Sequence, residues 1–510
     1  MHRTESQENV FALLADPATH SGAAVRRIDT HAASVFLAGE QAYKIKRAVL
    51  FPFLDYTTLA KRKAACEAEL AVNRPFAAEI YLRVVAITRQ DGRLSLGSPG
   101  EPVEWAVEMR RFDENATLDH LADRGKIDFP LADALARAMA AAHANAPVVE
   151  APPWTQALAR FIEQNDAAFR EMPHLFSAIE AHALTTASRA ALDRVRPLLH
   201  ARGTRGLVRR GHGDLHLGNI ALIDGRPVPF DAIEFDPLIA AGDVLYDLAF
   251  LLMDLTERGL MKAANVVLNR YLAETRRESD LDALGALPLF MSLRAAIRAK
   301  VTAARLENAD AAKRPAIAQA ATAYFRLASQ LNTPQEATLI AIGGLSGTGK
   351  SLLAHELAAD LLPAPGAVLL RSDVERKGLF GVPETERLPA EAYDAASTRR
   401  VYAALVDKAR RVLAAGHSAI VDAVFAADEE RAGIAAATPS RARFQGLFLA
   451  ADLATRLARV GARHHDASDA DVHVARHQES YDLGSLNWAR VDASGTPEDT
   501  LRHARAALAR

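Results

Sequence analysis

Eight consecutive residues, 344–351, have the types and spacing of a phosphate-binding turn. The glycines of this turn allow consecutive backbone N–H groups to face phosphate oxygens at a helix N-terminus, where the helix dipole favours negative charge. We expect Lys350 to reach the β- and γ-phosphates of ATP and Ser351 to bind Mg²⁺; the alternative is a glycine-rich turn without a ligand. The residues fit G-x-x-x-x-G-K-[ST] between an apolar strand and a helix, and they are Gly344, Leu345, Ser346, Gly347, Thr348, Gly349, Lys350 and Ser351.

A carboxylate stands where the next expected strand ends. Asp373 follows the apolar stretch 367–370, and ligands of open parallel-sheet proteins bind beyond the carboxyl ends of the strands. A carboxylate there can accept the proton of an attacking hydroxyl, so we expect Asp373 to be catalytic. The alternative is local helix capping, because Ser372 and Glu375 have the spacing of a capping box.

Asp422 ends another apolar strand in the same way. We expect Asp422 to orient Mg²⁺ or a water bound to it, whereas the alternative is a helix cap. Further along, Arg456, Arg459 and Arg463 have i, i+3 and i, i+4 spacing, so they share one helical face. Such a face can be simply exposed, or it can belong to a mobile lid that neutralises the phosphoryl group in flight.

A second constellation lies in the sequence HGDLHLGN at 212–219. It keeps the kinase spacing H-x-D-x-x-x-x-N, with Gly213 in place of the usual arginine. In this chemistry Asp214 accepts or orients the proton of an acceptor hydroxyl, and Asn219 binds a metal ion that bridges the ATP phosphates. Asp231, beyond a hairpin, is available as the second metal ligand.

The alternative for 212–219 is a polar turn with a structural pair of histidines. We expect His212 to anchor the loop, and His216 is left without a role.

A kinase also needs a lysine on an early strand, held by a glutamate from a helix, to position the α- and β-phosphates. Lys44 and Lys46 lie two apart and so on the same face of one strand; either could be the phosphate ligand while the other is exposed. Glu69 is the preferred partner over Glu67. The turn expected over the nucleotide, 38–40, lacks the G-x-G-x-x-G of ordinary protein kinases.

Patterns of apolar residues predict two parts with different organisation. Strand-like runs and one helical run form a small mixed lobe up to residue 110, and helices dominate from 130 to 329 except near 209–236, where a loop and a hairpin interrupt them. Polar residues 332–336 have the composition of a linker. Strands expected at 338–343, 367–370, 418–421 and 444–449 then alternate with helices, which indicates a parallel sheet. We therefore expect domains at 1–332 and 333–510.

The composition fits two to three folded domains. Of the 510 residues 50% are hydrophobic and 24% are charged, and the net charge of -2 gives no broad positive field for nucleic acid or an anionic membrane. The single cysteine, Cys66, excludes intramolecular disulfides. The start has no secretory pattern and no apolar run approaches about 18 residues, so we expect a cytoplasmic protein without membrane or nucleic-acid partners. The oligomeric state cannot be read.

Residues 10–330 resemble the aminoglycoside phosphotransferase and choline kinase superfamily. The resemblance is carried by segments 42–47, 51–55, 212–219 and 230–236, and it implies a bilobal, protein-kinase-like α+β fold. Residues 338–510 resemble the gluconate kinase, chloramphenicol phosphotransferase and zeta-toxin group, which implies a P-loop α/β domain. In that group the acid that matches Asp373 contacts the acceptor hydroxyl, and lid arginines that match Arg459 or Arg463 grip phosphates.

The whole arrangement is similar to bacterial proteins catalogued as bifunctional aminoglycoside phosphotransferase/ATP-binding proteins, a name that does not identify the acceptor. We expect an enzyme that uses ATP and Mg²⁺ to phosphorylate hydroxyls of small polar molecules, with both domains active. Two alternatives remain: a regulatory protein that senses ATP or a metabolite through one inactive domain, and a zeta-toxin-like kinase that acts on a nucleotide-sugar.

Overall fold

A computed structural model describes residues 7–51, 54–462 and 467–509. The chain divides into two compact units, one of Met1–Gln164 with Arg196–Asp254 and the other of Asn165–Val195 with Leu255–Arg510. The expected domain boundary at residue 332 lies inside the second unit, and the division into domains 1–332 and 333–510 stays a prediction. Within the described ranges, no helix combines the length and apolar character needed to cross a bilayer.

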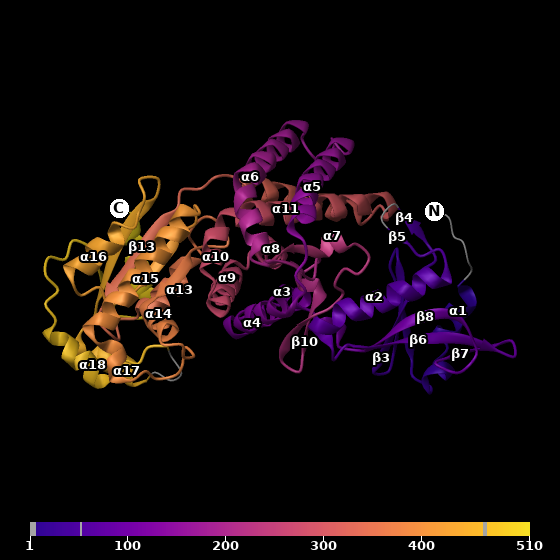
Figure 1. Ribbon diagram of the computed structural model, residues 1–510, viewed down its shortest axis with the longest axis horizontal. Helices are drawn as coiled ribbons and strands as arrows, with labels where there is room; N and C mark the ends of the chain where they lie inside the picture. Colours follow the sequence, from indigo (N-terminus) through magenta and orange to yellow (C-terminus); the bar gives the residue numbers. More distant parts are fainter. Residues whose placement is uncertain (1–6, 52–53, 463–466, 510) are drawn as a thin grey trace. The chain divides into compact units, whose positions relative to one another are not determined.

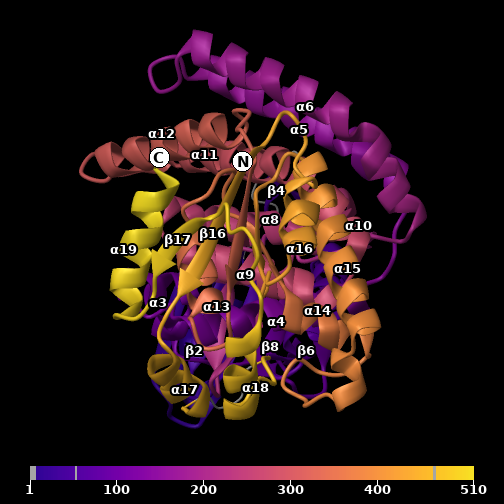
Figure 2. The ribbon, with the colours of Figure 1, turned by 90° about the vertical axis from the view of Figure 1, so that its left-hand side faces the viewer.

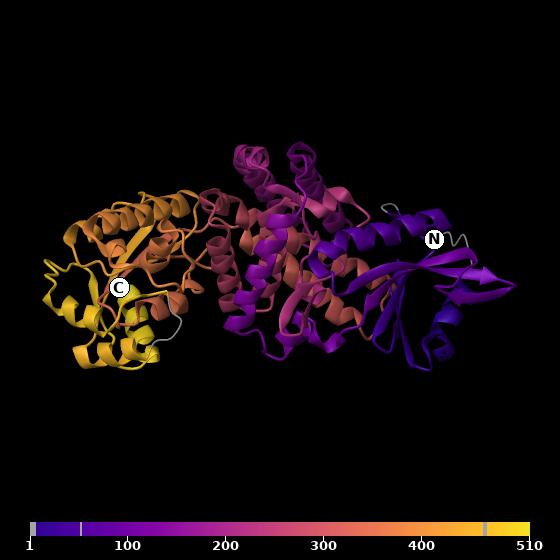
Figure 3. The same cartoon turned by 60° about the horizontal axis from the view of Figure 1, so that its bottom comes forward.

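An antiparallel sheet forms the start of the first unit (Figure 3). Its strand order in the described residues is β1-β2-β3-β8-β6-β7. Helix α2 (Leu59–Ala77) packs on the face that carries Leu37 and Val107, and helix α1 (Glu8–Ala15) packs on the opposite face with Phe36 and Ile45. The strands are β1 (Val25–Asp29), β2 (Ala33–Ala38), β3 (Gln41–Lys46), β6 (Tyr81–Gln90), β7 (Arg93–Leu96) and β8 (Glu101–Arg110).

The remainder of the first unit is mostly helical, as expected, and contains the hairpin of β10 and β11 with its turn at Asp224 and Gly225. Helices α5, α6 and α8 each contribute residues to both units. The further elements are β4 (Leu50–Phe51), β5 (Leu54–Asp55), α3 (Leu118–Asp123), α4 (Phe129–Asn145), α5 (Ala151–Glu171), α6 (Ala178–Thr204), β9 (Val208–Arg210), β10 (Ile220–Ile223), β11 (Arg226–Pro229), α7 (Pro237–Ala240), β12 (Ala241–Asp243) and α8 (Val244–Glu257).

A parallel sheet is the centre of the second unit (Figures 1 and 2). Its order is β14-β15-β13-β16-β17 in the described residues, and every neighbouring pair is parallel. Strands β13 (Thr338–Gly344), β14 (Val368–Arg371), β15 (Ala419–Asp422) and β16 (Arg443–Ala450) match the four expected ones, and β17 (Ala489–Asp492) is an addition. The expected fold class, a kinase-like α+β part followed by a P-loop α/β part, is confirmed.

Helices cover both faces of this sheet. Residues of α13 and α19 share one core with Ile340 and Ile342 of β13, whereas α15 contacts the strands from the other side (Figure 2). The helices of the second unit are α9 (Met261–Thr275), α10 (Glu278–Asp282), α11 (Leu287–Ala304), α12 (Arg314–Leu331), α13 (Lys350–Ala358), α14 (Ser372–Leu379), α15 (Ala395–Ala414), α16 (Asp428–Ala435), α17 (Leu453–Gly461), α18 (Val472–His477) and α19 (Pro497–Leu508).

Strand β14 is the edge of the sheet, and asparagines of α9 pair with its backbone. The side-chain oxygen of Asn269 accepts the N–H of Leu369 at 2.7 Å, and its Nδ2 donates to the carbonyl of Ala367 at 3.1 Å. Asn265, which is buried, donates to the same carbonyl at 3.0 Å. Backbone groups at a sheet edge lack a partner strand, so here two amide side chains take the place of one.

We expect Asn269→Ala to destabilise the second unit, because it leaves the Leu369 N–H without its acceptor. The expected loss is about 0.5–1.5 kcal/mol for a partly buried hydrogen bond, partly offset by the better helix propensity of alanine. The measurement is chemical unfolding of the full chain followed by circular dichroism. Asn487→Ala, at an exposed position of the same unit, is the control, and equal unfolding midpoints for the two variants would contradict the role of Asn269.

Candidate functional sites

The turn between β13 and α13 has the backbone that phosphate binding requires. Gly347 has φ +90°, and a Cβ there would lie 2.6 Å from the carbonyl oxygen of Arg456. Gly349 has φ +88° and is the N-cap of α13. Both conformations favour glycine. The helix begins at Lys350, and the N–H groups of a first helical turn, which lack acceptors within the helix, are suited to an anion.

Ser351 and Asp422 lie together at the end of the sheet. The Ser351 hydroxyl donates to Oδ2 of Asp422 at 2.5 Å and accepts from Nη2 of Arg371 at 3.1 Å. Asp422 is the last residue of β15 and is buried, while α16 begins six residues later with Ala427 as its N-cap. Asp422 is therefore not a helix cap. A hydroxyl and a carboxylate are hard oxygen donors of the kind that Mg²⁺ prefers, so the expected pair fits this ion.

Asp373 is in the first turn of α14, whose N-cap is Arg371 and has no side-chain capping bond. Glu375 instead pairs with Lys408 at 2.5 Å, so the capping box considered for Ser372 and Glu375 is not formed. Burial, followed by the nearby charge of Asp422, raises the pKa of Asp373. A carboxylate with a raised pKa has the stronger affinity for a proton that a general base needs.

The raised pKa predicts the acid side of the pH profile. If Asp373 is the expected base, it can act only when ionised, so product formation at this site should fall as the pH drops through a value above the ordinary 3.8 of aspartate. The test is the pH dependence of product formation in the Asp214→Asn variant, which lacks the acid expected at the other site. An acid limb centred at or below pH 3.8 would contradict the assignment. Asp373→Asn is the control, because it has no carboxyl group at this position and its residual activity should lack this acid limb.

These residues line one pocket of about 730 Å³ in the second unit. Lys350, Ser351, Asp373 and Asp422 all contribute to its wall. Beyond them, the buried Arg376 donates from Nη1 to the carbonyl of Ala392 at 2.6 Å, and its guanidinium lies 4.8 Å from the ring centroid of Tyr393. The pocket therefore combines phosphate-binding groups at one part with aromatic and polar side chains at another.

The arginines of α17 have different positions from those expected. Arg459 donates to the backbone carbonyls of Ala493 and Gly495, both at 2.7 Å, and does not line the P-loop pocket. Its expected contact with phosphates is not supported, because its guanidinium is bound elsewhere. Arg456 instead reaches the turn: it is buried, and its Nε donates to the carbonyl of Ser346 at 2.9 Å. Arg463 lies outside the described residues.

In the first unit, Asp247 of α8 holds the backbone of the loop at 212–219. Its carboxylate oxygens accept the N–H groups of His212 and Gly213, both at 2.9 Å. Gly213 has φ +81°, and a Cβ would lie 3.0 Å from Cα of Ala240, which accounts for a glycine at this place. The buried His212 ring bonds the carbonyl of Phe230 at 2.9 Å, and burial lowers the pKa of His212. The interpretation of His212 as an anchor agrees with these contacts.

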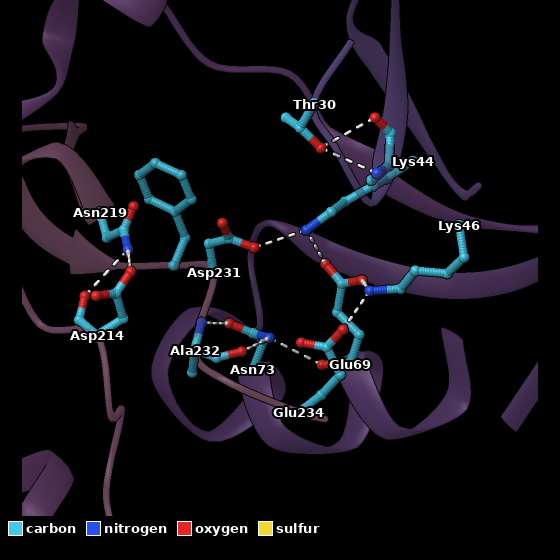
Figure 4. Close-up of polar contacts among 12 residues, drawn as sticks. Thr30, Lys44, Lys46, Glu69, Asn73, Asp214, Asn219, Asp231, Ala232 and Glu234 are labelled. Atoms are coloured by element: carbon cyan, nitrogen blue, oxygen red, sulfur yellow. Dashed lines mark hydrogen bonds and ion pairs between the residues drawn. The ribbon is translucent and has the colours of Figure 1, made fainter. Parts of the chain in front are cut away.

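Asp214 and Asn219 face each other across the loop (Figure 4). Nδ2 of Asn219 donates at 3.0 Å both to the carboxylate and to the carbonyl of Asp214. This leaves the amide oxygen of Asn219 for other contacts. His216, left without a role by the sequence, accepts the N–H of Gly218 at 3.1 Å through Nδ1 and lies 3.5 Å from Asp214 through Nε2. It helps to shape the loop next to the acid.

Both lysines of β3 bind the same glutamate (Figure 4). Nζ of Lys44 lies 2.7 Å from one carboxylate oxygen of Glu69, and Nζ of Lys46 lies 2.7 Å from the other. Burial alone would raise the pKa of Glu69, but the two lysines outweigh it and lower that pKa to about 2. Glu67 pairs with Lys63 on the exposed side of α2. The expectation that one of the two lysines is merely exposed is wrong, because Glu69 of α2 forms an ion pair with each of them.

Asp231 forms an ion pair with Lys44. Nζ of Lys44 lies 2.6 Å from Oδ1 of Asp231, and both line a pocket of about 520 Å³. The Asp231 carboxylate and the amide oxygen of Asn219 are the oxygen donors that Mg²⁺ would use here, and their chemistry fits the ion. The turn that borders this pocket contains Thr30 and His31, between β1 and β2. Turn 38–40 does not line this pocket, and the turn that does, at 30–32, also lacks glycine.

Two mycobacterial proteins are similar to nearly the whole chain. An uncharacterized protein of Mycobacterium tuberculosis (strain ATCC 25618 / H37Rv) is 29% identical over 491 residues, which cover 93% of this chain and 94% of the relative. An uncharacterized protein of Mycobacterium bovis matches with the same values.

Solved structures of small-molecule kinases are also similar to parts of the chain. A choline/ethanolamine kinase family protein from Mesorhizobium loti is 13% identical with a TM-score of 0.36, covering 64% of this chain and 98% of its own. A gluconokinase from Sinorhizobium meliloti 1021 is 22% identical with a TM-score of 0.25, covering 35% of this chain and 93% of its own.

A match to the AAA domain family covers residues 339–482. This range contains the turn at 344–351 together with Asp373 and Asp422. The last third of the chain thus carries the P-loop domain that its sequence predicted.

Proposed function

We propose that this protein is an ATP-dependent phosphotransferase with two sites, each of which transfers the γ-phosphoryl group of ATP to a hydroxyl of a small polar molecule. The observation that carries the proposal is the pocket in the second unit, where Lys350, Ser351, Asp373 and Asp422 converge. One wall supplies a cation for phosphate, oxygen donors for a metal ion and a carboxylate with a raised pKa. Phosphoryl transfer requires these groups and little covalent chemistry from the protein.

At the P-loop site, Lys350 and the backbone N–H groups at the start of α13 bind the β- and γ-phosphates. Ser351 and Asp422 would hold Mg²⁺, which supplies neutralisation of phosphate charge when bound. Asp373 accepts the proton of the acceptor hydroxyl as its oxygen attacks the γ-phosphorus. The bond between that phosphorus and the β,γ-bridging oxygen breaks, and ADP leaves. Arg376 also lines this pocket.

At the kinase-like site, Lys44 binds phosphate oxygens and Glu69 fixes its direction. Asn219 and Asp231 would hold Mg²⁺, and Asp214 orients the acceptor hydroxyl and takes its proton. Asp247 supports this geometry through the backbone of His212 and Gly213. Catalysis at both sites then depends on alignment and charge neutralisation, which together account for the rate enhancement of this class of reaction.

A product screen tests the proposal. Full-length protein is incubated with ATP, Mg²⁺ and a library of polyols, sugars, amino alcohols and nucleotide-sugars, and phosphorylated products are found by mass spectrometry. Asp214→Ala and Lys350→Ala are run in parallel. Loss of a different product in each variant supports two phosphotransferase sites. ATP binding without any product in the wild type would instead favour a sensor, and a phosphorylated nucleotide-sugar lost only in Lys350→Ala would favour a zeta-toxin-like kinase.

A further inference from the structure

The kinase-like site contains a second lysine whose contacts the proposed mechanism does not use. We propose that Lys46 is a positioning residue for phosphoryl transfer: by bonding Glu69 and Glu234 together, it fixes the carboxylate that directs Lys44 and the segment that carries Asp231. The proposal rests on the phosphotransferase function proposed above for this site. Figure 4 shows the residues concerned.

Exposure separates the roles of the two lysines. The Lys44 side chain is 15% exposed and its partner Asp231 is 47% exposed, so this pair opens to the pocket. Lys46 is 3% exposed and Glu234 is 8% exposed. Each ammonium group contacts two carboxylates and both lysines line the pocket, but the pair of Lys44 with Asp231 is the more open to solvent, so a phosphate that enters the pocket meets Lys44 first. Lys44 is accordingly the phosphate ligand, and Lys46 acts through its neighbours.

The segment from Asp231 to Glu234 is held at both ends. The Asp231 N–H donates to the Tyr81 hydroxyl at 3.0 Å, and the Ala232 N–H donates to the side-chain oxygen of Asn73 at 2.8 Å. At the far end Glu234 accepts from Lys46 and, at 3.0 Å, from the hydroxyl of Tyr56. Asp231 has φ +62°, a conformation that a non-glycine residue adopts at a cost. These contacts fix the backbone conformation of residues 231–234 and keep the Asp231 carboxylate next to Lys44.

The charges of this network explain why a lysine is needed. Lys44 and Lys46 share three carboxylates, those of Glu69, Asp231 and Glu234. Without Lys46, the described residues would leave Glu69 with Lys44 as its cationic partner and the buried Glu234 side chain with the Tyr56 hydroxyl. Both changes would draw Lys44 away from the pocket and release the end of the segment that carries Asp231.

The test uses the full-length chain with Lys350→Ala, so that ATP binding and hydrolysis report on the kinase-like site. Lys46→Met, Glu234→Gln, the double variant Lys46→Met/Glu234→Gln and Lys44→Met are compared by titration calorimetry with Mg·ATP, by ATP turnover and by thermal unfolding. Lys63→Met, an exposed lysine of α2, is the control for the loss of a lysine charge in the same unit.

We expect Lys46→Met to lower turnover by about 10–100-fold and to raise the Kd of Mg·ATP less than Lys44→Met does, which should raise that Kd by at least about 10-fold. The double variant removes one buried unpaired charge, so its unfolding temperature should recover while its turnover stays low. Recovery of turnover together with stability would make Lys46 merely structural and overturn the inference. Unchanged turnover in Lys46→Met would overturn the inference as well. If turnover were unchanged in Lys44→Met and Asp214→Asn too, the proposed function of this site would fail instead.

Discussion

Lys350→Ala should remove one of two ATP-binding sites. In calorimetric titrations with Mg·ATP, the wild type is expected to bind two nucleotides per chain and the variant one. The P-loop lysine makes charge-assisted hydrogen bonds to two phosphates, each worth about 1.5–3 kcal/mol, so the affinity of the second site should fall by at least ~10²-fold. The one nucleotide that the variant still binds should have the affinity of the kinase-like site, because the substitution does not change Lys44 or Lys46.

Lys313→Ala is the matched control for this experiment, since Lys313 is a highly exposed lysine of the same unit. It should bind two nucleotides as the wild type does. Two full-affinity sites in Lys350→Ala would show that the glycine-rich turn is not a phosphate-binding site.

Asp214→Asn should separate binding from chemistry at the kinase-like site. The substitution keeps the size of the side chain and its position beside Asn219 but removes the proton acceptor. In the Lys350→Ala background we expect ATP turnover to fall by ~10²–10⁴-fold, the range for loss of a general base, while the Kd of Mg·ATP stays within about 3-fold. Steady-state turnover and calorimetry on the same preparations provide the two values.

Asp224→Asn is the control for the exchange of a carboxylate for an amide, because Asp224 is exposed at the tip of the β10–β11 hairpin. Its left-handed backbone, with φ +49°, is one that asparagine adopts readily. Equal turnover in Asp214→Asn and Asp224→Asn would remove Asp214 from the reaction.

The parts of the sites that the sequence predicted are those set by local order. The P-loop is one contiguous strand, turn and helix, so its pattern contains its own structural context. Asp373 and Asp422 could be assigned to one edge because the carboxyl ends of parallel strands meet there. Asp214 and Asn219 are only five residues apart, so the sequence alone places both side chains in one short loop.

Other features depend on packing between distant segments, which no local pattern records. The sharing of Glu69 by two lysines follows from the position of α2 across the sheet. The choice of Arg456 over Arg459 follows from which side of α17 meets Gly347; the small glycine was the available signal, because it permits a backbone carbonyl to approach. The turn with Thr30 and His31 was missed because β1 was not resolved as a separate strand in the sequence pattern.

The asparagines of α9 have a consequence for handling the protein. A fragment that starts at residue 333 would lose Asn265 and Asn269, and the backbone of β14 would then be open for pairing with another copy. Open strand edges are templates for intermolecular association. A P-loop fragment that also includes α9 should therefore stay in solution at concentrations at which the fragment that starts at residue 333 precipitates.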